Sequence, residues 1–191
     1  MNIRSADIED GARPACTETI VLGAHDNHYY IRPIRPDELD AVLGVYRQCE
    51  DFLALGPVPT ASMAMVLQDI EISQREGGVF CGIYDAADGG MIGVVDYVPR
   101  GFEDDPHLAH LSLLMIAAPF RQRGVGKAVV EAVEQEIAKD ARVTAILSGV
   151  QVNNPHAIRF WQKRGYRIVS GPTLMPDQTT VFGLQKWLGV I

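Results

Sequence analysis

The chain has 191 residues and a mass of 20.9 kDa, which suits one well-filled core, and its 47% hydrophobic and 21% charged residues are ordinary globular composition. The formal net charge is −7 and no Lys/Arg-rich block occurs, so we expect no nucleic-acid partner. The polar start of the chain lacks a signal-peptide pattern, and the longest apolar stretch, Leu111 to Phe120, is too short to span a bilayer. We therefore expect a cytoplasmic protein without membrane contact.

Three cysteines, Cys16, Cys49 and Cys81, are odd in number and widely spaced. No C-x-x-C pair or Cys/His cluster accompanies them, so the sequence favours neither a disulfide framework nor a zinc site. The histidines have no spacing that indicates a metal either. We expect reduced cysteines, two of them buried, and no metal.

The first 27 residues are expected to form a loose arm, with one extra strand at Thr19 to Leu22, and residues 28–191 a single domain. The domain begins with an alternating strand at His28 to Ile34. Two helices follow, one opened by Pro36 and one from Ala61 to about Arg75.

The pattern then changes from helical to extended. Apolar, β-branched runs at Gly78 to Tyr84 and Met91 to Val98 flank a hairpin composition. Leu108 to Ala117 is nearly all apolar, as in a strand covered on both faces. An amphipathic helix is predicted at Gly124 to Lys139, and a further strand at Val143 to Val152.

The last helix has clear end signals, with Asn154 as N-cap, Pro155 at its first position and Gly165 as its stop. Strands at Tyr166 to Ser170 and Gln178 to Leu184 complete the pattern. The fold class is therefore α/β (α+β): a mixed, mostly antiparallel sheet of six to seven strands, with helices on both faces.

The most informative segment is the turn that joins the buried strand to the amphipathic helix. It reads Arg121-Gln122-Arg123-Gly124-Val125-Gly126-Lys127. Free N–H groups and the helix dipole at such a helix start favour a phosphate. Two glycines let the backbone approach it, and the arginines add positive charge.

Two common phosphate motifs do not fit this turn. The P-loop pattern requires glycine at the place of Arg121 and Ser or Thr at the place of Ala128. The dinucleotide fingerprint requires glycine at the place of Val129. The remaining pattern, Arg121-x-x-Gly124-x-Gly126, resembles the pyrophosphate-binding R/Q-x-x-G-x-G/A motif of the GNAT superfamily of acetyl-CoA-dependent N-acetyltransferases.

A second signature follows at a spacing that is typical of that family. The segment from Asn154 to Tyr166 is similar to the GNAT pattern N-x-x-A-x-x-(L/F)-(Y/W)-x-(K/R)-x-G-(F/Y). The resemblance is strong from Met91 to Tyr166, looser from Tyr30 to Tyr84, and absent before about His28. It implies the GNAT fold and acetyl-CoA as cosubstrate.

The resemblance also implies which residues bind the cofactor. The pantetheine arm would pair with the backbone of Leu114, Met115 and Ile116, almost as an added strand. The pyrophosphate would lie in the turn from Arg121 to Gly126, with Lys127 on the first helical turn. Asn154 matches the asparagine that holds the cofactor arm, and Trp161 would pack beside that arm.

In this family an uncharged primary amine attacks the thioester carbonyl directly, which requires a base for the amine proton. Relatives often carry a glutamate where this chain has His110, whose imidazole could act directly or through water. Ser112 lies on the same strand face and could relay a proton. Asp96 is the second candidate base, ahead of the acidic residues Glu103 to Asp105. Relatives use a tyrosine at the position of Trp161 to protonate the thiolate, and an indole cannot do so.

Several alternatives stay open. The chain could be a non-catalytic acyl-CoA-binding or sensing domain of the same fold, or a phosphopeptide- or nucleotide-binding module. The acceptor, a small or peptidyl amine, is not identified: Asp51 and Glu50 could meet a cationic amine or form a solvated helix end. Dimers are frequent in this superfamily, so a homodimer is also open.

Overall fold

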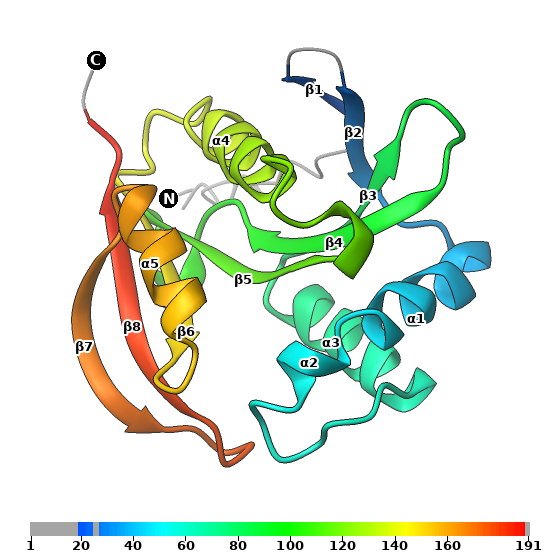
Figure 1. Cartoon of the computed structure of the whole chain (residues 1–191). Helices are drawn as coiled ribbons and strands as arrows, with labels where there is room; N and C mark the ends of the chain where they lie inside the picture. The colour runs from blue at the N-terminus through cyan, green and yellow to red at the C-terminus, as the bar shows by residue number, and fades with distance from the viewer. Residues whose placement is uncertain (1–18, 25–26, 190–191) are drawn as a thin grey trace, which may run out of the picture.

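The structure is a computed structural model, and it describes residues 19–24 and 27–189. Most of the expected N-terminal arm, including Cys16, lies outside these residues. Within the described part, the expected extra strand is present as β1, which forms a hairpin with β2. Figure 1 shows this hairpin at one edge of the sheet.

A single eight-stranded sheet runs through the molecule in the order β1-β2-β3-β4-β5-β6-β8-β7. All neighbouring pairs are antiparallel except β5 and β6, so the expected mixed, mostly antiparallel sheet is confirmed. The expected six to seven strands become eight because β1 joins the edge. The strands are β1 Ile20–Ala24, β2 Asn27–Pro33, β3 Val79–Asp85, β4 Met91–Val98, β5 Leu108–Ile116, β6 Ala145–Gln151, β7 Arg167–Leu174 and β8 Thr180–Trp187.

Helices cover both faces of the sheet, as predicted (Figure 1). Helices α4 and α5 pack on one face, while α1 and α3 pack on the other. The helices are α1 Leu39–Arg47, α2 Glu50–Leu53, α3 Met63–Arg75, α4 Val125–Ile137 and α5 Pro155–Lys163, with short 3-10 turns η1 Pro36–Glu38, η2 Phe102–Asp104 and η3 Ala118–Phe120.

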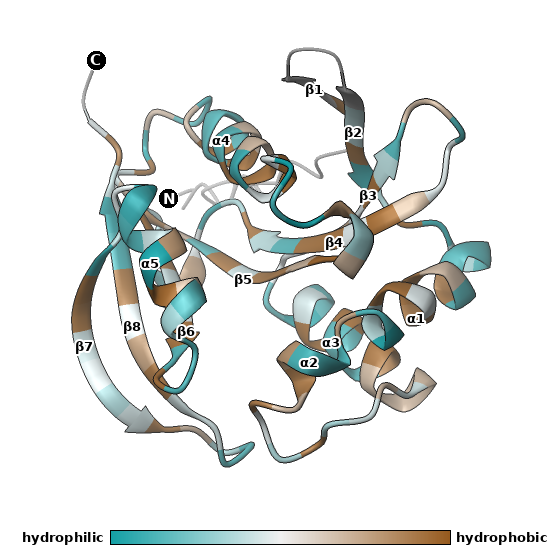
Figure 2. Cartoon of the chain, viewed as in Figure 1, coloured by the Kyte–Doolittle hydropathy of each residue, from teal (hydrophilic) through white to brown (hydrophobic). Residues whose placement is uncertain are grey.

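Each face of the sheet has its own hydrophobic core. The predicted stripe of α4, which includes Val129 and Val133, is fully buried against β4 and β5. On the other face, Val42 and Tyr46 of α1 pack with Val66 of α3 against β4. Apolar residues follow the central strands β4 and β5 in Figure 2, while the outer surface of α5 is mostly polar. The central strands are thus fixed from both sides.

Strands β5 and β6 separate partway along their length. Their parallel pairing begins at Leu108↔Ala145 and ends at Leu111↔Ser148. Beyond that point β5 continues to Ile116, while β6 stays paired with β8. The Ser148 hydroxyl donates a hydrogen bond to the Leu111 carbonyl at 2.8 Å, at the point of separation. The end of β5 therefore has one edge free of β6.

A bulge lies at the same place on the other edge of β5. The register with β4 passes from Tyr97↔Leu111 to Asp96↔Leu113, so Ser112 has no partner on β4. A bulge adds a residue to one strand and redirects its side chains. Leu111, before Ser112, therefore packs in the core on the face of α4 and α5, whereas Leu113, after it, packs on the face of α1 and α3.

Two smaller expectations can be assessed here. Cys49 and Cys81 are both buried, which agrees with the expectation that two of the cysteines are buried. Among residues 19–24 and 27–189, none of the helices has the length and apolar character needed to cross a membrane.

Candidate active site

The glycine turn opens α4 in the way that the sequence predicted. Gly124 is the N-cap and has a φ of 83°, in the left-handed region that favours glycine. Val125 follows as a buried anchor with 2% exposure. Gly126 is helical, and a Cβ built there would lie 3.7 Å from the Phe160 ring, which is ordinary contact. The fold itself therefore does not require glycine at this position.

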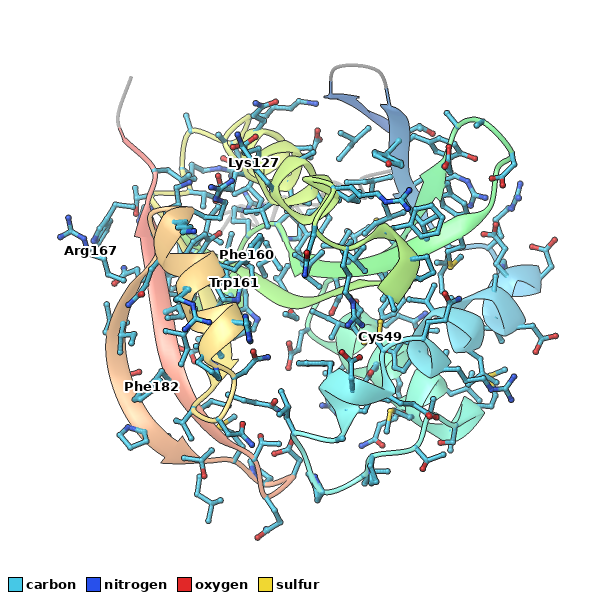
Figure 3. The ribbon with its side chains drawn as sticks, viewed as in Figure 1. Cys49, Lys127, Phe160, Trp161, Arg167 and Phe182 are labelled. Atoms are coloured by element: carbon cyan, nitrogen blue, oxygen red, sulfur yellow. The ribbon has the colours of Figure 1, made fainter. Side chains whose placement is uncertain are left out.

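A pocket of about 390 Å³ lies between this turn, the end of β5 and the last turns of α5. Figure 3 labels two of the residues that line this pocket, Lys127 on α4 and Phe160 on α5. Six predicted cofactor residues line it, together with three residues that the sequence did not single out, two in α5 and one at its C-cap. The lining residues are Ile116, Arg121, Gln122, Gly124, Gly126, Lys127, Phe160, Lys163 and Arg164.

The other predicted residues of the turn and of β5 have different places. The guanidinium of Arg123 lies 5.6 Å from the centre of the Phe120 ring and does not line the pocket. Val125 and Met115 are buried, and Leu114 packs against the core. Their side chains hold the strand and the helix in place, so a ligand at the end of β5 would mainly meet their backbone groups.

Arg121 does more than add charge to the turn. Its guanidinium forms a two-pronged ion pair with Asp51 of α2, with Nη2 to Oδ1 at 2.9 Å. Its Nε donates to the Ile116 carbonyl at 2.7 Å, and its Nη2 to the Gln48 carbonyl at 3.3 Å. This pairing lowers the pKa of the Asp51 carboxyl. Arg121 thus ties the turn to the end of β5 and to α2, so its charge is shared with Asp51.

Two residues of the second signature have mainly structural contacts. The Asn154 side chain accepts a hydrogen bond from the Ala157 N–H at 3.0 Å, which is the predicted N-cap. Trp161 is only 6% exposed and packs edge-on against Phe160 and Tyr166. Trp161 does not line the pocket; its neighbour Phe160 does.

His110 and Ser112 lie together on β5, where β5 and β6 separate. The Ser112 Oγ lies 3.0 Å from His110 Nδ1 and is exposed, so the pair borders open space. The ring of Phe102, from η2, stacks on the imidazole at 4.0 Å between centroids and 15° between planes. Burial lowers the pKa of His110 to about 4, because the charged imidazolium is disfavoured there.

The loop that carries Phe102 has an unusual backbone. Gly101, Glu103 and Asp104 have φ values of 79°, 54° and 61°, all in the left-handed region. Such conformations are costly outside glycine and are found where a loop must hold one particular shape. Here that shape places the phenyl ring against His110. Glu103 and Asp104 are exposed beside it.

Asp96, the second candidate base, is buried elsewhere. It is 4% exposed and accepts a hydrogen bond from the Ser73 hydroxyl of α3 at 2.6 Å. Burial is the largest cause of the rise of its pKa to about 6, and the nearby carboxylates of Glu76 and Asp69 add to it. This environment supports a structural role between β4 and α3 rather than contact with a substrate.

No group of three or more His, Cys, Asp or Glu side chains that could hold a metal is present in the described part of the chain.

The pocket fits a phosphate-bearing cofactor in two respects. A Cβ at Gly126 would occupy space that the fold leaves open, and one nitrogen of Arg164, Nη1, is buried without a hydrogen-bond partner.

Comparisons with known proteins agree with this arrangement. Residues 42–166 match the family model described as the acetyltransferase (GNAT) family. The chain therefore belongs to the GNAT acetyltransferase family. No curated protein matches the sequence.

Solved structures share the fold at low sequence identity. An acetyltransferase from Thermus thermophilus has a TM-score of 0.70 at 20% identity, covering 84% of this chain and 97% of its own. A spermidine N-acetyltransferase from Vibrio cholerae, in complex with CoA and spermine, has 0.64 at 13%, covering 83% and 95%. An aminoglycoside acetyltransferase in complex with coenzyme A has 0.65 at 18%, covering 83% and 94%.

Proposed function

We propose that this protein is an N-acetyltransferase that moves the acetyl group of acetyl-CoA to a primary amine by direct attack. One arrangement carries this proposal: the free edge of β5 leads from the His110–Ser112 pair to the glycine turn and its basic pocket. A pantetheine arm between β5 and β6 would connect the two. Two of the similar structures support the same reaction class: the aminoglycoside acetyltransferase in complex with coenzyme A, and the spermidine N-acetyltransferase in complex with CoA and spermine.

Binding would use backbone and charge together. The carbonyl and N–H groups of Leu114 to Ile116 on the free side of β5 would pair with the pantetheine amides. The pyrophosphate would meet the N–H groups at the start of α4, where the helix dipole favours an anion, and the Lys127 ammonium. Phe160 provides an apolar wall.

In the chemical step the amine nitrogen attacks the thioester carbonyl, the C–S bond breaks, and the products are the acetylated amine and the CoA thiol. One amine proton goes to His110 Nε2, a proton from water completes the thiol, and the His110 imidazolium then returns its proton to the hydroxide that remains. For this, Nδ1–H of His110 donates to the Ser112 Oγ, which leaves the Nε2 lone pair available. Because its pKa is about 4, His110 is uncharged at neutral pH and able to accept a proton.

Ligand-induced stabilisation tests the cofactor assignment. A ligand at one hundred times its Kd stabilises the folded state by about 2.7 kcal/mol, which corresponds to roughly 5–10 °C in Tm for a chain of this size. Acetyl-CoA should produce such a shift in a thermal melt, and ADP, which lacks the pantetheine arm, should produce much less. If ATP or NAD raised the Tm more than acetyl-CoA does, the assignment of the glycine turn would be wrong.

A further inference from the structure

The basic pocket contains more positive charge than the glycine turn alone needs. Four cationic side chains line it: Arg121, Lys127, Lys163 and Arg164. The charge of Arg121 is balanced by Asp51. Lys127 and Arg164 share one carboxylate, Glu131, which lies 3.8 Å from Lys127 Nζ and 3.7 Å from Arg164 Nη1. A net positive charge therefore remains at this pocket, on a chain whose net charge is −7.

These cations form two groups on different helices. Lys127 belongs to the first turn of α4, beside the turn that would hold the pyrophosphate. Lys163 and Arg164 come from the end of α5, one helical turn after the pocket residue Phe160. The second group is not part of the glycine motif, so it is available to an anionic group other than the pyrophosphate.

Arg164 has an unsatisfied donor. Its side chain is 19% exposed, and its Nη1 is buried without a hydrogen-bond partner among the described residues. Glu131 is too distant at 3.7 Å for a hydrogen bond. A buried, unpaired donor on a charged group is costly, so a small rotation of the guanidinium toward an anion in the pocket would be favourable. Lys163 is exposed, and no carboxylate in the described part of the chain is found paired with it.

Building on the proposed function, we propose that Lys163 and Arg164 form a subsite for the 3′-phosphate of coenzyme A. Coenzyme A carries this phosphate monoester on its ribose, apart from the pyrophosphate, with a charge of about −1.5 to −2 at neutral pH. An arginine fork and a lysine ammonium are the side chains best suited to such a group. The protein then distinguishes coenzyme A from 3′-dephospho-coenzyme A.

The wild-type protein tests this subsite without any substitution. Calorimetric titration at low ionic strength should give a Kd for coenzyme A at least about tenfold below that for 3′-dephospho-coenzyme A, because charge-assisted hydrogen bonds are lost with the phosphate. Added salt should narrow this ratio. Equal affinities would overturn the subsite and leave the cofactor assignment intact. Binding of neither compound would overturn both.

Variants locate the effect. Lys163→Gln and Arg164→Gln should each weaken coenzyme A binding about three- to tenfold and leave dephospho-coenzyme A nearly unchanged. Arg164→Lys should keep part of the discrimination. Arg159→Gln removes an exposed cation from the same helix outside the pocket, and it should change neither Kd. If the Lys163 and Arg164 variants weakened both compounds equally, these cations would act on the pyrophosphate or on the helix end, and the subsite would be refuted.

Discussion

The imidazole of His110 is held between a phenyl ring and a hydroxyl group, and these neighbours decide the pH at which it can accept a proton. Burial is the cause of its low pKa. The charged groups on the elements that pack against it are Glu103 and Asp104 of η2 and Asp96 of β4, while β6 carries none between Ala145 and Gln151. The stacking partner Phe102 is therefore the residue through which this pKa can be altered.

His110→Ala should lower kcat by roughly 10²–10⁴-fold, the usual size of a general-base contribution, with little effect on the affinity for acetyl-CoA. In the wild type, the acid limb of kcat/KM should fall near pH 4 because protonation removes the base.

Phe102→Leu should expose the imidazole and move its pKa up toward about 6.5, so activity at pH 5 falls while activity at pH 8 is kept.

These pH–rate profiles should be recorded with two amines of different pKa, since a limb that follows the amine belongs to the substrate. Wild-type kcat in His110→Ala would remove His110 from the mechanism. An unchanged acid limb in Phe102→Leu would show that the ring does not control the imidazole.

Asp96→Asn should stabilise the protein at alkaline pH. Burial raises the pKa of Asp96 to about 6 from 3.8, so the folded state binds a proton more tightly than the unfolded state, and stability declines as pH rises between these values. The amide carries no charge and can still accept the Ser73 hydrogen bond. We expect a gain of about 1–3 kcal/mol at pH 8, measured by urea unfolding, that shrinks toward pH 4. Activity should remain; a loss of about 10²-fold in kcat would make Asp96 the base instead.

At the scale of elements, the β5–turn–α4 unit was predictable because its signals are local. A continuous apolar run defines the strand, two glycines define the turn, and period-3.6 spacing defines the helix. Strand β7 was predicted to end at Ser170 but extends to Leu174. The register of β7 with β8 shifts at two bulges, and these bulges let the edge strand continue past Pro172. Because such shifts depend on the partner strand, the sequence of β7 alone could not predict its full length.

The turn itself can be tested with Gly126→Val, because the family motif also accepts alanine at this position. The new Cβ would meet the Phe160 ring at 3.7 Å and the Ile116 side chain at 3.9 Å, both ordinary contacts, and valine is no less favourable than glycine in a helix. The unliganded protein should therefore be about as stable as the wild type, while coenzyme A binding weakens at least about tenfold because the branched side chain narrows the pocket. The measurements are a thermal melt and a calorimetric titration.

Gly44→Val is the matched control. Gly44 is also helical and has nothing within 4 Å of an added Cβ, but it lies on α1 and does not line the pocket. This variant should keep a similar stability and bind coenzyme A normally. Unchanged affinity in Gly126→Val would contradict the assignment of the pocket, and a large loss of stability would show that the glycine is needed by the fold.

At the scale of the whole molecule, the family and the sheet could be predicted from two motifs and the periodicity, whereas contacts between distant segments could not. The Arg121–Asp51 pair joins residues 70 positions apart, and Phe102 meets His110 only because a loop with three left-handed residues returns to β5. The order of neighbours on α5 belongs to the same kind of information: Phe160 lines the pocket, while Trp161 belongs to the core. The place of Trp161 beside the cofactor arm stays a prediction.

The most direct test of the central claim is the product balance of the reaction. Purified protein is incubated with acetyl-CoA and a panel of primary amines, and free CoA thiol and acetylated amine are both quantified. Our account predicts that at least one amine gives thiol and acetyl-amine in equal amounts, well above the rate of acetyl-CoA hydrolysis without amine, and that His110→Ala suppresses both. Tight binding of acetyl-CoA with no amine-dependent thiol release for any acceptor class would contradict it, and would instead indicate an acyl-CoA-binding domain of the same fold.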